Sequence, residues 1–323
     1  MPTTPARTPD PATPAPLAAP GAGPNLGLVC ITAGEEVRYR TITRTRFLSF
    51  DEGRQRAALD ELYRDNVQTL FKAVDYCHAR GIRLYRVTSN LFPQVDHPVG
   101  RATLESLREA MQGFGAYAAK LDVRVVIHPD QYVVLNSESP AVVGQSVAIM
   151  ADHARVFDLL GLPRSAWSLM LLHGGKGGRA DALVETIAGL PENVRTRLAL
   201  ENDESAFSAA QILDVCRRAG VPMVFDAHHH AVREKLDSYE DASVRAFTLA
   251  ARETWAPHPE WQVVHISNGA TSFRDPKHSD TITRFPAAFI DVPWVEVEAK
   301  QKEVAIGRLR MTLGRPGGPR QPA

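Results

Sequence analysis

The stretch V-P-M-V-F-D-A-H-H-H, residues 221–230, is a short apolar run followed directly by an acid and three histidines. Runs of this kind that end at polar residues are typical of buried strands in a parallel sheet. Asp226 and His229 are three residues apart, so they face the same side if the chain turns helically after the strand. His228 and His230 then point elsewhere. The stretch therefore predicts a strand over 221–226 that delivers one acid and the middle histidine to its carboxyl end.

The same pattern recurs along the chain. Seven further apolar or β-branched runs cover 26–32, 82–88, 123–128, 167–173, 197–201, 261–267 and 293–298. Segments with helical spacing separate them, including a long helix that ends before Gly81, a helix over about 102–121 and another near 140–160. Eight strands that alternate with helices predict an α/β protein with a single (β/α)8 TIM barrel. A doubly wound open sheet is the alternative, but it would spread the strand ends along a line.

Six of the eight runs end at or beside a side chain that can bind a metal. Any one of these residues could be a solvated strand end or a helix cap. In a closed barrel, however, all six converge on the C-terminal rim, which favours a shared metal site. Imidazoles and carboxylates without thiolates suit zinc, manganese or iron, and their number suggests two or three ions. Such a centre favours phosphodiester hydrolysis, with Glu201 as a carboxylate that bridges two ions. The six residues are His128, His173, Glu201, Asp226, His265 and Glu298.

Composition sets the broad class of protein. The 323 residues include 37 basic and 37 acidic side chains, so contacts with DNA would have to come from a local patch. Three cysteines without C-x-x-C spacing argue against a disulfide scaffold and indicate a reducing, cytoplasmic location. The first residues lack the basic-then-apolar order typical of a signal peptide, and no apolar stretch approaches the roughly 20 residues that a membrane helix needs. We expect a Pro/Ala-rich disordered tail over 1–24, the barrel over 25–312 and a flexible tail over 313–323.

Two segments are candidates for contact with DNA phosphates. R-Y-R-T-I-T-R-T-R places Arg38 and Arg40 after the first predicted strand, although a solvated loop explains this segment equally well. The loop H-G-G-K-G-G, residues 173–178, contains Lys176 but lacks P-loop spacing, so its glycines are interpreted as allowing close approach to the metals.

Several ordered segments carry a family resemblance. They run from about residue 26 to 311 and read L-Y-R-V-T-S-N-L-F-P, V-I-H-P-D-Q-Y-V-V-L-N-S, L-L-H-G-G, L-A-L-E-N-D-E, V-F-D-A-H-H-H, V-V-H-I-S, K-H-S-D and V-E-A-K-Q-K-E. In these the chain resembles the UV-damage endonuclease family, which is related to endonuclease IV among the xylose-isomerase-like barrels. The resemblance implies cleavage of damaged double-stranded DNA immediately 5′ to a lesion, leaving a 3′-hydroxyl and a 5′-phosphate. It also implies two or three divalent ions, Mn²⁺ foremost, with Zn²⁺ or Mg²⁺ as alternatives.

The resemblance also implies roles for individual residues. Gln131 and Tyr132 match a pair that probes the helix at a flipped-out lesion. Leu28, Thr32 and Val263 depart from the tyrosine, asparagine and lysine of many relatives, which bears on the lesion pocket and the metal surroundings. The implied catalytic residues are Glu201, His229 and Glu298. The implied metal ligands are His97, His128, His173, Glu201, Asp226, His229, His265, His278 and Glu298.

Four functions are compatible with these patterns. The leading hypothesis is a monomeric, metal-dependent repair endonuclease that acts on UV photoproducts and also on lesions such as abasic sites. An endonuclease IV-like enzyme chiefly for abasic sites shares its fold and chemistry. A barrel sugar isomerase would use fewer metal ligands, and a non-enzymatic DNA-binding module would not need a rim of ligands at all.

Overall fold

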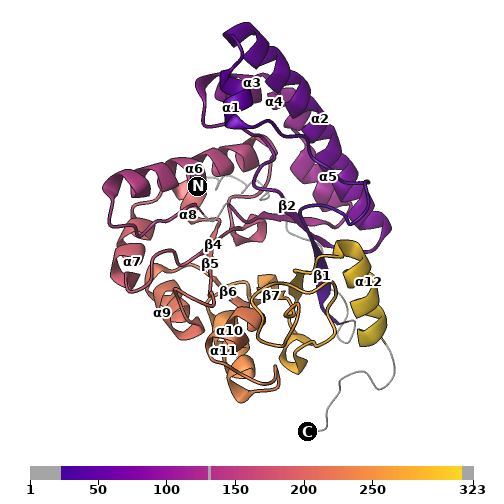
Figure 1. Cartoon of the computed structure of the whole chain (residues 1–323), viewed down its shortest axis with the longest axis vertical. Helices are drawn as coiled ribbons and strands as arrows, with labels where there is room; N and C mark the ends of the chain where they lie inside the picture. The colour runs from indigo at the N-terminus through magenta and orange to yellow at the C-terminus, as the bar shows by residue number, and fades with distance from the viewer. Residues whose placement is uncertain (1–22, 130–131, 315–323) are drawn as a thin grey trace, which may run out of the picture.

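The computed structural model describes residues 23–129 and 132–314, and in this part of the chain eight parallel strands form a closed barrel (Figure 1). Each strand is hydrogen-bonded to the next in chain order, and the last pairs with the first. The predicted barrel is confirmed and the open sheet is excluded. The predicted tails lie, apart from four residues, outside the described part. The strands are β1 Asn25–Val29, β2 Leu84–Val87, β3 Arg124–Ile127, β4 Met170–His173, β5 Leu198–Glu201, β6 Met223–Asp226, β7 Val263–Ile266 and β8 Trp294–Val297.

Helices surround the barrel, and α1, α3 and α4 extend from it at one end of the molecule (Figure 1). Of the described helices, none has the length and apolar character needed to cross a lipid bilayer. The helices are α1 Arg44–Leu48, α2 Glu52–Ala79, α3 Pro98–Ser106, α4 Arg108–Met111, α5 Phe114–Lys120, α6 Pro140–Leu159, α7 Ala180–Ala188, α8 Glu192–Arg195, α9 Ala209–Ala219, α10 Ala227–Arg233, α11 Ala242–Glu253 and α12 Lys302–Leu313. Short 3₁₀ turns cover Ala166–Ser168, Pro259–Trp261 and Ala287–Phe289.

Two of the predicted helices form and one is divided. The long helix α2 ends as expected before Gly81, which has a φ of 63°. α6 begins at Pro140, whose ring fits the first turn of a helix. The single helix predicted over 102–121 is wrong, because that segment contains the end of α3 and the whole of α4 and α5. Gly113 explains part of this break, since its φ of 90° is left-handed and cannot continue a right-handed helix.

The barrel interior follows the two-residue alternation of side chains along each strand. Its lower layer is apolar and consists mainly of Leu84, Val126, Leu169, Leu171, Ala199, Val224, Val263 and Trp294. The next interior position on seven strands is polar or charged: Arg86, His128, His173, Glu201, Asp226, His265 and Glu296. On β1, a side chain at Gly27 would come within 2.8 Å of Leu84 Cδ2. The alternation therefore places a charged layer directly above an apolar one.

Arg124 closes the N-terminal mouth of the barrel. Its fully buried guanidinium donates hydrogen bonds to the carbonyls of Ala166, Trp167 and Trp261 at 2.7–2.8 Å. It also lies over the rings of Trp167, Trp255 and Trp294. Because these hydrogen bonds and rings satisfy a charge that burial disfavours, the guanidinium ties three separate segments together.

Replacing Arg124 with methionine should lower the free energy of unfolding by about 3 kcal/mol, because three buried carbonyls lose their donor. Urea unfolding followed by circular dichroism measures this loss. Arg83→Gln is the matched control, since it removes an exposed pair with Asp122 and should cost less than about 0.5 kcal/mol. Equal stability of the two variants would contradict the structural role of Arg124.

Candidate metal centre

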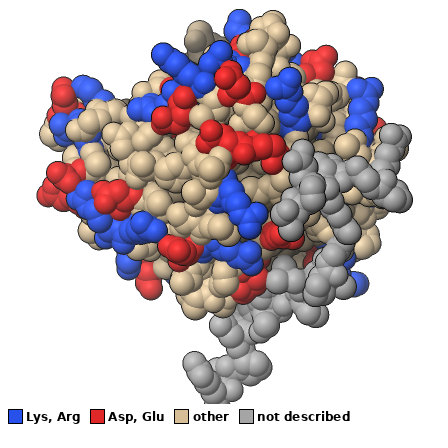
Figure 2. Space-filling model, turned by 90° about the horizontal axis from the view of Figure 1, so that it is seen from below, with Lys and Arg blue, Asp and Glu red and all other residues tan. Residues whose placement is uncertain are grey.

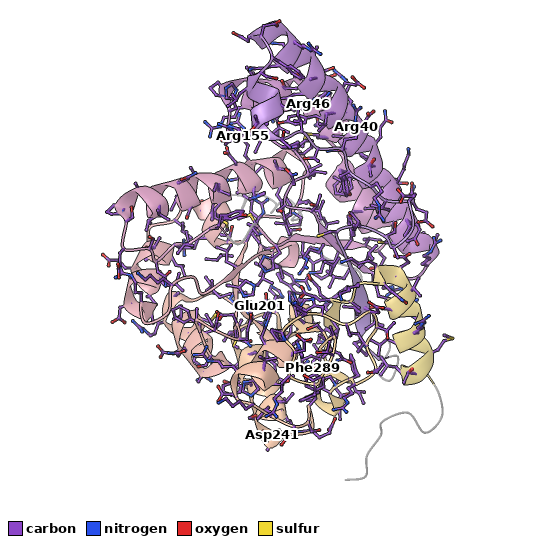
Figure 3. All side chains as sticks on the ribbon, in the orientation of Figure 1. Arg40, Arg46, Arg155, Glu201, Asp241 and Phe289 are labelled. Atoms are coloured by element: carbon purple, nitrogen blue, oxygen red, sulfur yellow. The ribbon has the colours of Figure 1, made fainter. Side chains whose placement is uncertain are left out.

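Glu201 lies at the centre of the barrel and its two carboxylate oxygens face different partners (Figure 3). Oε1 is 2.9 Å from His265 Nδ1. Oε2 is 3.3 Å from His128 Nε2 and 3.9 Å from His173 Nε2. The carboxylate is 1% exposed. This arrangement can join two metal sites through one carboxylate.

The ligand side chains fall into three overlapping groups. In each group, one nitrogen or oxygen from every residue lies within 4.8 Å of the others. Strand register explains the grouping, because His173 pairs with Glu201 and His265 pairs with both Asp226 and Glu296 on neighbouring strands. The groups are His128, His173 and Glu201; Glu201, Asp226 and His265; and His265, Glu296 and Glu298.

His128 is oriented by its own loop. Its Nδ1 lies 3.0 Å from the carbonyl oxygen of Pro129. A carbonyl can only accept a hydrogen bond, so Nδ1 carries the proton and Nε2 is directed to Glu201. The ring centroid lies 5.0 Å from that of His173.

The junction of β6 and α10 places Asp226 and His229. Asp226 is the N-cap of α10, and its Oδ1 accepts a hydrogen bond from the backbone N–H of His229 at 2.7 Å. The amide of Asn202 accepts from the Asp226 N–H and donates to its carbonyl, which fixes the acid between two strands. Asp203 accepts from the N–H groups of residues 205 to 207, which fixes the loop between β5 and α9.

The three consecutive histidines have different surroundings. Buried His228 contacts the Tyr239 hydroxyl at 2.8 Å and the Asp275 carbonyl at 2.9 Å. His230 Nε2 is 2.9 Å from the Ser243 hydroxyl. The ring of His229 instead lies 5.7 Å from that of His173, with Nδ1 2.8 Å from Glu204 Oε2. As the D-x-x-H spacing predicts, the middle histidine is the one beside the cluster.

The cluster stabilises ionised carboxylates. Burial alone would raise the pKa of Glu201, but His265 and His173 hold that pKa well below its usual range. Burial likewise opposes protonation of His265, but Glu201 and Glu296 raise its pKa well above the ordinary value. A hydrogen bond from His229 lowers the pKa of Glu204 to about 2. Glu201 and Glu204 are therefore ionised at neutral pH, and a protonated His265 balances part of this negative charge.

The donor atoms fit divalent metal ions. Asp226 Oδ2 is buried and has no hydrogen-bond partner among the described residues. Glu296 Oε1 also has none, but the other carboxylate oxygen of Glu296 already faces the Arg86 guanidinium. A buried carboxylate oxygen without a partner is costly, and a bound cation would remove that cost. All donors are imidazole nitrogens or carboxylate oxygens, which suit zinc, manganese or iron.

The predicted ligands on loops lie at different places. His278 is at the edge of the cluster, with Nε2 3.8 Å from Glu298 Oε2. Glu298 itself directly follows β8, and its Oε1 is 3.5 Å from His265 Nδ1. His97 is the N-cap of α3, where its Nδ1 accepts from Val99 N–H at 3.3 Å. The described contacts of His97 therefore do not join it to the cluster.

The residues predicted to contact DNA differ in their exposure and in the partners that they already have. Tyr132 is 76% exposed, and Gln131 lies outside the described residues. Arg38 donates to backbone carbonyls of residues 32, 33 and 37, so its guanidinium is committed within its own loop. Arg40 pairs with Glu61 and Asp65, and Lys176 Nζ lies 3.0 Å from Glu138. A phosphate would have to replace these partners.

The arginine-containing segment after β1 lies away from the candidate metal centre, and the surface charges of the protein are mixed. Arg40 and Arg46 lie between β1 and α2, at the end of the molecule away from Glu201 (Figure 3). On the face shown in Figure 2, basic and acidic side chains are interspersed. This distribution agrees with the balanced overall charge.

The departures from the resemblance are buried. Leu28 packs in the core between barrel and helices, and Val263 belongs to the apolar layer inside the barrel. Thr32 Oγ1 accepts from the Val37 N–H at 3.1 Å. Leu28 therefore does not line the barrel interior, whereas Val263 does.

Three residues of the site were missed by sequence reasoning: Arg86, Glu204 and Glu296. Glu296 could have been found from E-V-E at 296–298, because two-residue spacing places both acids on one face of a strand. Arg86 is likewise an alternate interior position of β2. For Glu204 the sequence offers no comparable periodic signal.

Known proteins match nearly the whole chain. The family model UV-endonuclease UvdE matches residues 24–315. The UV DNA damage endonuclease of Nostoc sp. is 51% identical over 291 residues, covering 90% of each chain. That of Deinococcus radiodurans is also 51% identical, covering 89% of this chain and 95% of its own.

Solved structures share the fold. The crystal structure of SacUVDE has a TM-score of 0.76 at 24% identity and covers 90% of this chain and 98% of its own. Endonuclease IV from Thermus thermophilus has a TM-score of 0.52 at 16% identity, with 89% and 97% covered. At these identities the likeness supports the barrel architecture.

Alanine substitutions should distinguish the structural role of His228 from the metal-binding role proposed for His229. His228→Ala should lower the free energy of unfolding by about 2 kcal/mol, because two buried hydrogen bonds are lost. His229→Ala should cost about half as much in the metal-free protein but weaken Mn²⁺ binding at least about 10-fold. Urea unfolding and calorimetric Mn²⁺ titration measure the two effects, and unchanged Mn²⁺ affinity in His229→Ala would show that this ring is not part of the metal centre.

Proposed function

The chain belongs to the UV-endonuclease UvdE family, and from this premise we propose that it is a metal-dependent repair enzyme that cuts DNA immediately 5′ to UV photoproducts. The cut leaves a 3′-hydroxyl and a 5′-phosphate in double-stranded DNA. Abasic sites are proposed as further substrates. The observation that carries the proposal is the buried Glu201 carboxylate, shared between two ligand groups at the rim of the barrel.

Two of the ligand groups would hold the proposed metal ions, Mn²⁺ foremost. His128, His173 and Glu201 would hold one ion, and Glu201, Asp226 and His265 a second. Bound divalent ions activate water and stabilise charge on a phosphodiester during its hydrolysis.

The side chains of the protein have distinct tasks in this scheme. Glu201 fixes the position of the two groups relative to each other, because one carboxylate oxygen faces each group. His229 and Glu298 border the groups, beside His173 and His265 respectively. The imidazole of His229 can pair with the scissile phosphate, and the Glu298 carboxylate can hold a metal ion or accept a hydrogen bond from water. The apolar layer below excludes water from the inner side of the centre, which strengthens every charge interaction above it.

Contact with the damaged duplex is assigned to the rim loops. Tyr132 follows the ligand His128 by four residues and exposes its ring, as a side chain that stacks on bases requires. Lys176 lies in the loop that begins at His173 and is half-exposed. We assign both residues to DNA binding, and Gln131 and Arg40 remain weaker candidates.

Purified protein with Mn²⁺ should nick UV-irradiated supercoiled plasmid and leave unirradiated plasmid intact. Chelation should stop the reaction and restored Mn²⁺ should recover it. Gel electrophoresis of the relaxed form measures nicking, and a plasmid with abasic sites tests the further substrate. Equal nicking of irradiated and unirradiated plasmid would contradict lesion specificity.

The position of the cut requires a defined substrate. A labelled duplex that contains one cyclobutane pyrimidine dimer should yield a fragment that ends directly 5′ to the dimer. A DNA polymerase should extend this fragment without further processing. A fragment that resists extension would exclude a 3′-hydroxyl product.

Glu201→Gln should retain the fold and lose cleavage by about 1,000-fold or more, because the shared ligand loses its charge.

Tyr132→Ala should instead weaken binding to damaged duplex while Mn²⁺ affinity is unchanged. Glu185→Gln, an exposed change on α7, is the matched control for both. Near-normal turnover by Glu201→Gln would refute the bridging role.

A further inference from the structure

Arg86 lies inside the barrel beside two acids. Its guanidinium is on the interior face of β2, and its side chain is 12% exposed. Nη1 lies 2.9 Å from Glu296 Oε2 and 2.5 Å from Glu298 Oε1. Both acids come from the β8 region, which pairs with β1 on the other side, so the contacts cross the barrel interior.

The third ligand group, His265, Glu296 and Glu298, therefore already contains a cation. A guanidinium stays protonated at any physiological pH, so it cannot give up its charge to admit a metal ion. A divalent ion placed on both acids would meet this charge at short range in a region of low exposure, where repulsion is strong. The other two groups have no such arginine contact among the described residues.

His265 presents its two nitrogens to different carboxylates. Nδ1 lies 2.9 Å from Glu201 Oε1, on the side of the second ligand group. Nε2 lies 3.1 Å from Glu296 Oε2, the oxygen that also contacts Arg86. A histidine that binds a metal through one nitrogen commonly has a carboxylate at the other, and this partner sets the ring orientation and tautomer.

We propose that Arg86 is the built-in cation of the third group, so that Glu296 positions His265 instead of binding a metal ion. This inference rests on the proposed metal dependence. The Arg86–Glu296 pair keeps Nδ1 of His265 directed to Glu201. Arg86 also holds Oε1 of Glu298 and leaves Oε2 facing His278. Arg86 and Glu296 are positioning residues, because they act through His265 and Glu298.

The number of Mn²⁺ ions per chain tests this assignment without any use of activity. Calorimetric titration of metal-free protein, with metal analysis of the desalted complex, gives both count and affinity. Glu296→Gln should bind as many ions as the wild type, with the affinity of one site weakened about 10- to 100-fold. Loss of one ion in Glu296→Gln would overturn the proposal, because it would make Glu296 a ligand.

Arg86→Met tests the same assignment in the opposite direction. Without the guanidinium, two buried carboxylates lack a counter-charge, so this variant should bind one more Mn²⁺ than the wild type. The double variant Arg86→Met with Glu296→Gln should return to the wild-type count. An unchanged count in Arg86→Met would overturn the built-in cation, and Glu296→Gln decides the question if Arg86→Met fails to fold.

Glu201→Gln serves as the reference, since removal of the shared ligand should reduce the number of bound ions. A wild-type protein that binds no Mn²⁺, Zn²⁺ or Mg²⁺ would refute the proposed metal dependence itself. If the wild type binds metal but Glu296→Gln loses one ion, or Arg86→Met binds no extra ion, only the positioning role is refuted.

Discussion

Burial of several carboxylates at one level of a closed barrel is the constraint on which the rest of this structure depends. Alternation along each strand sends every second side chain inward, and closure of the sheet brings those side chains together. Apolar residues occupy the lower level, so water cannot screen the charges of the level above from that side. Positive charge must then be supplied nearby, by histidines, by Arg86 or by bound ions.

The positive charges differ in kind, and this difference separates the three ligand groups. Imidazoles can release a proton and offer a lone pair to a metal, whereas a guanidinium cannot. His128, His173 and His265 surround Glu201, but Arg86 contacts Glu296 and Glu298. The barrel therefore combines acids that can share a metal with acids whose charge is already balanced by the protein.

Features that depend on local sequence could be predicted. Each strand was visible as an apolar run, and the D-x-x-H spacing was enough to distinguish His229 from its neighbours because a helix begins immediately after Asp226. The convergence of the strand ends on one rim could be predicted from eight such runs alone, without knowledge of any tertiary contact. Helix 102–121 was predicted too long, because its apolar periodicity continues through Gly113, where the backbone turns left-handed.

Features that depend on contacts across the barrel could not be predicted in this way. Glu296 and Arg86 stand within runs that otherwise indicate buried strands, and their pairing joins residues 210 positions apart. The place of His97 and His278 is set by loops whose course follows no periodic pattern. Leu28 faces the helical layer, because it stands one step of strand alternation away from the interior position at Gly27.

Among the described residues, the filled N-terminal mouth below the apolar layer leaves the C-terminal rim as the open side of the candidate metal centre. Arg124 and its surrounding tryptophan rings fill the N-terminal mouth, while His173 and His278 are partly exposed at the opposite end. Ions that bind the proposed centre would therefore reach it from the rim, the same side on which DNA would bind. A duplex bound on the rim would then slow the exchange of the proposed ions with bulk solution until the nicked DNA dissociates.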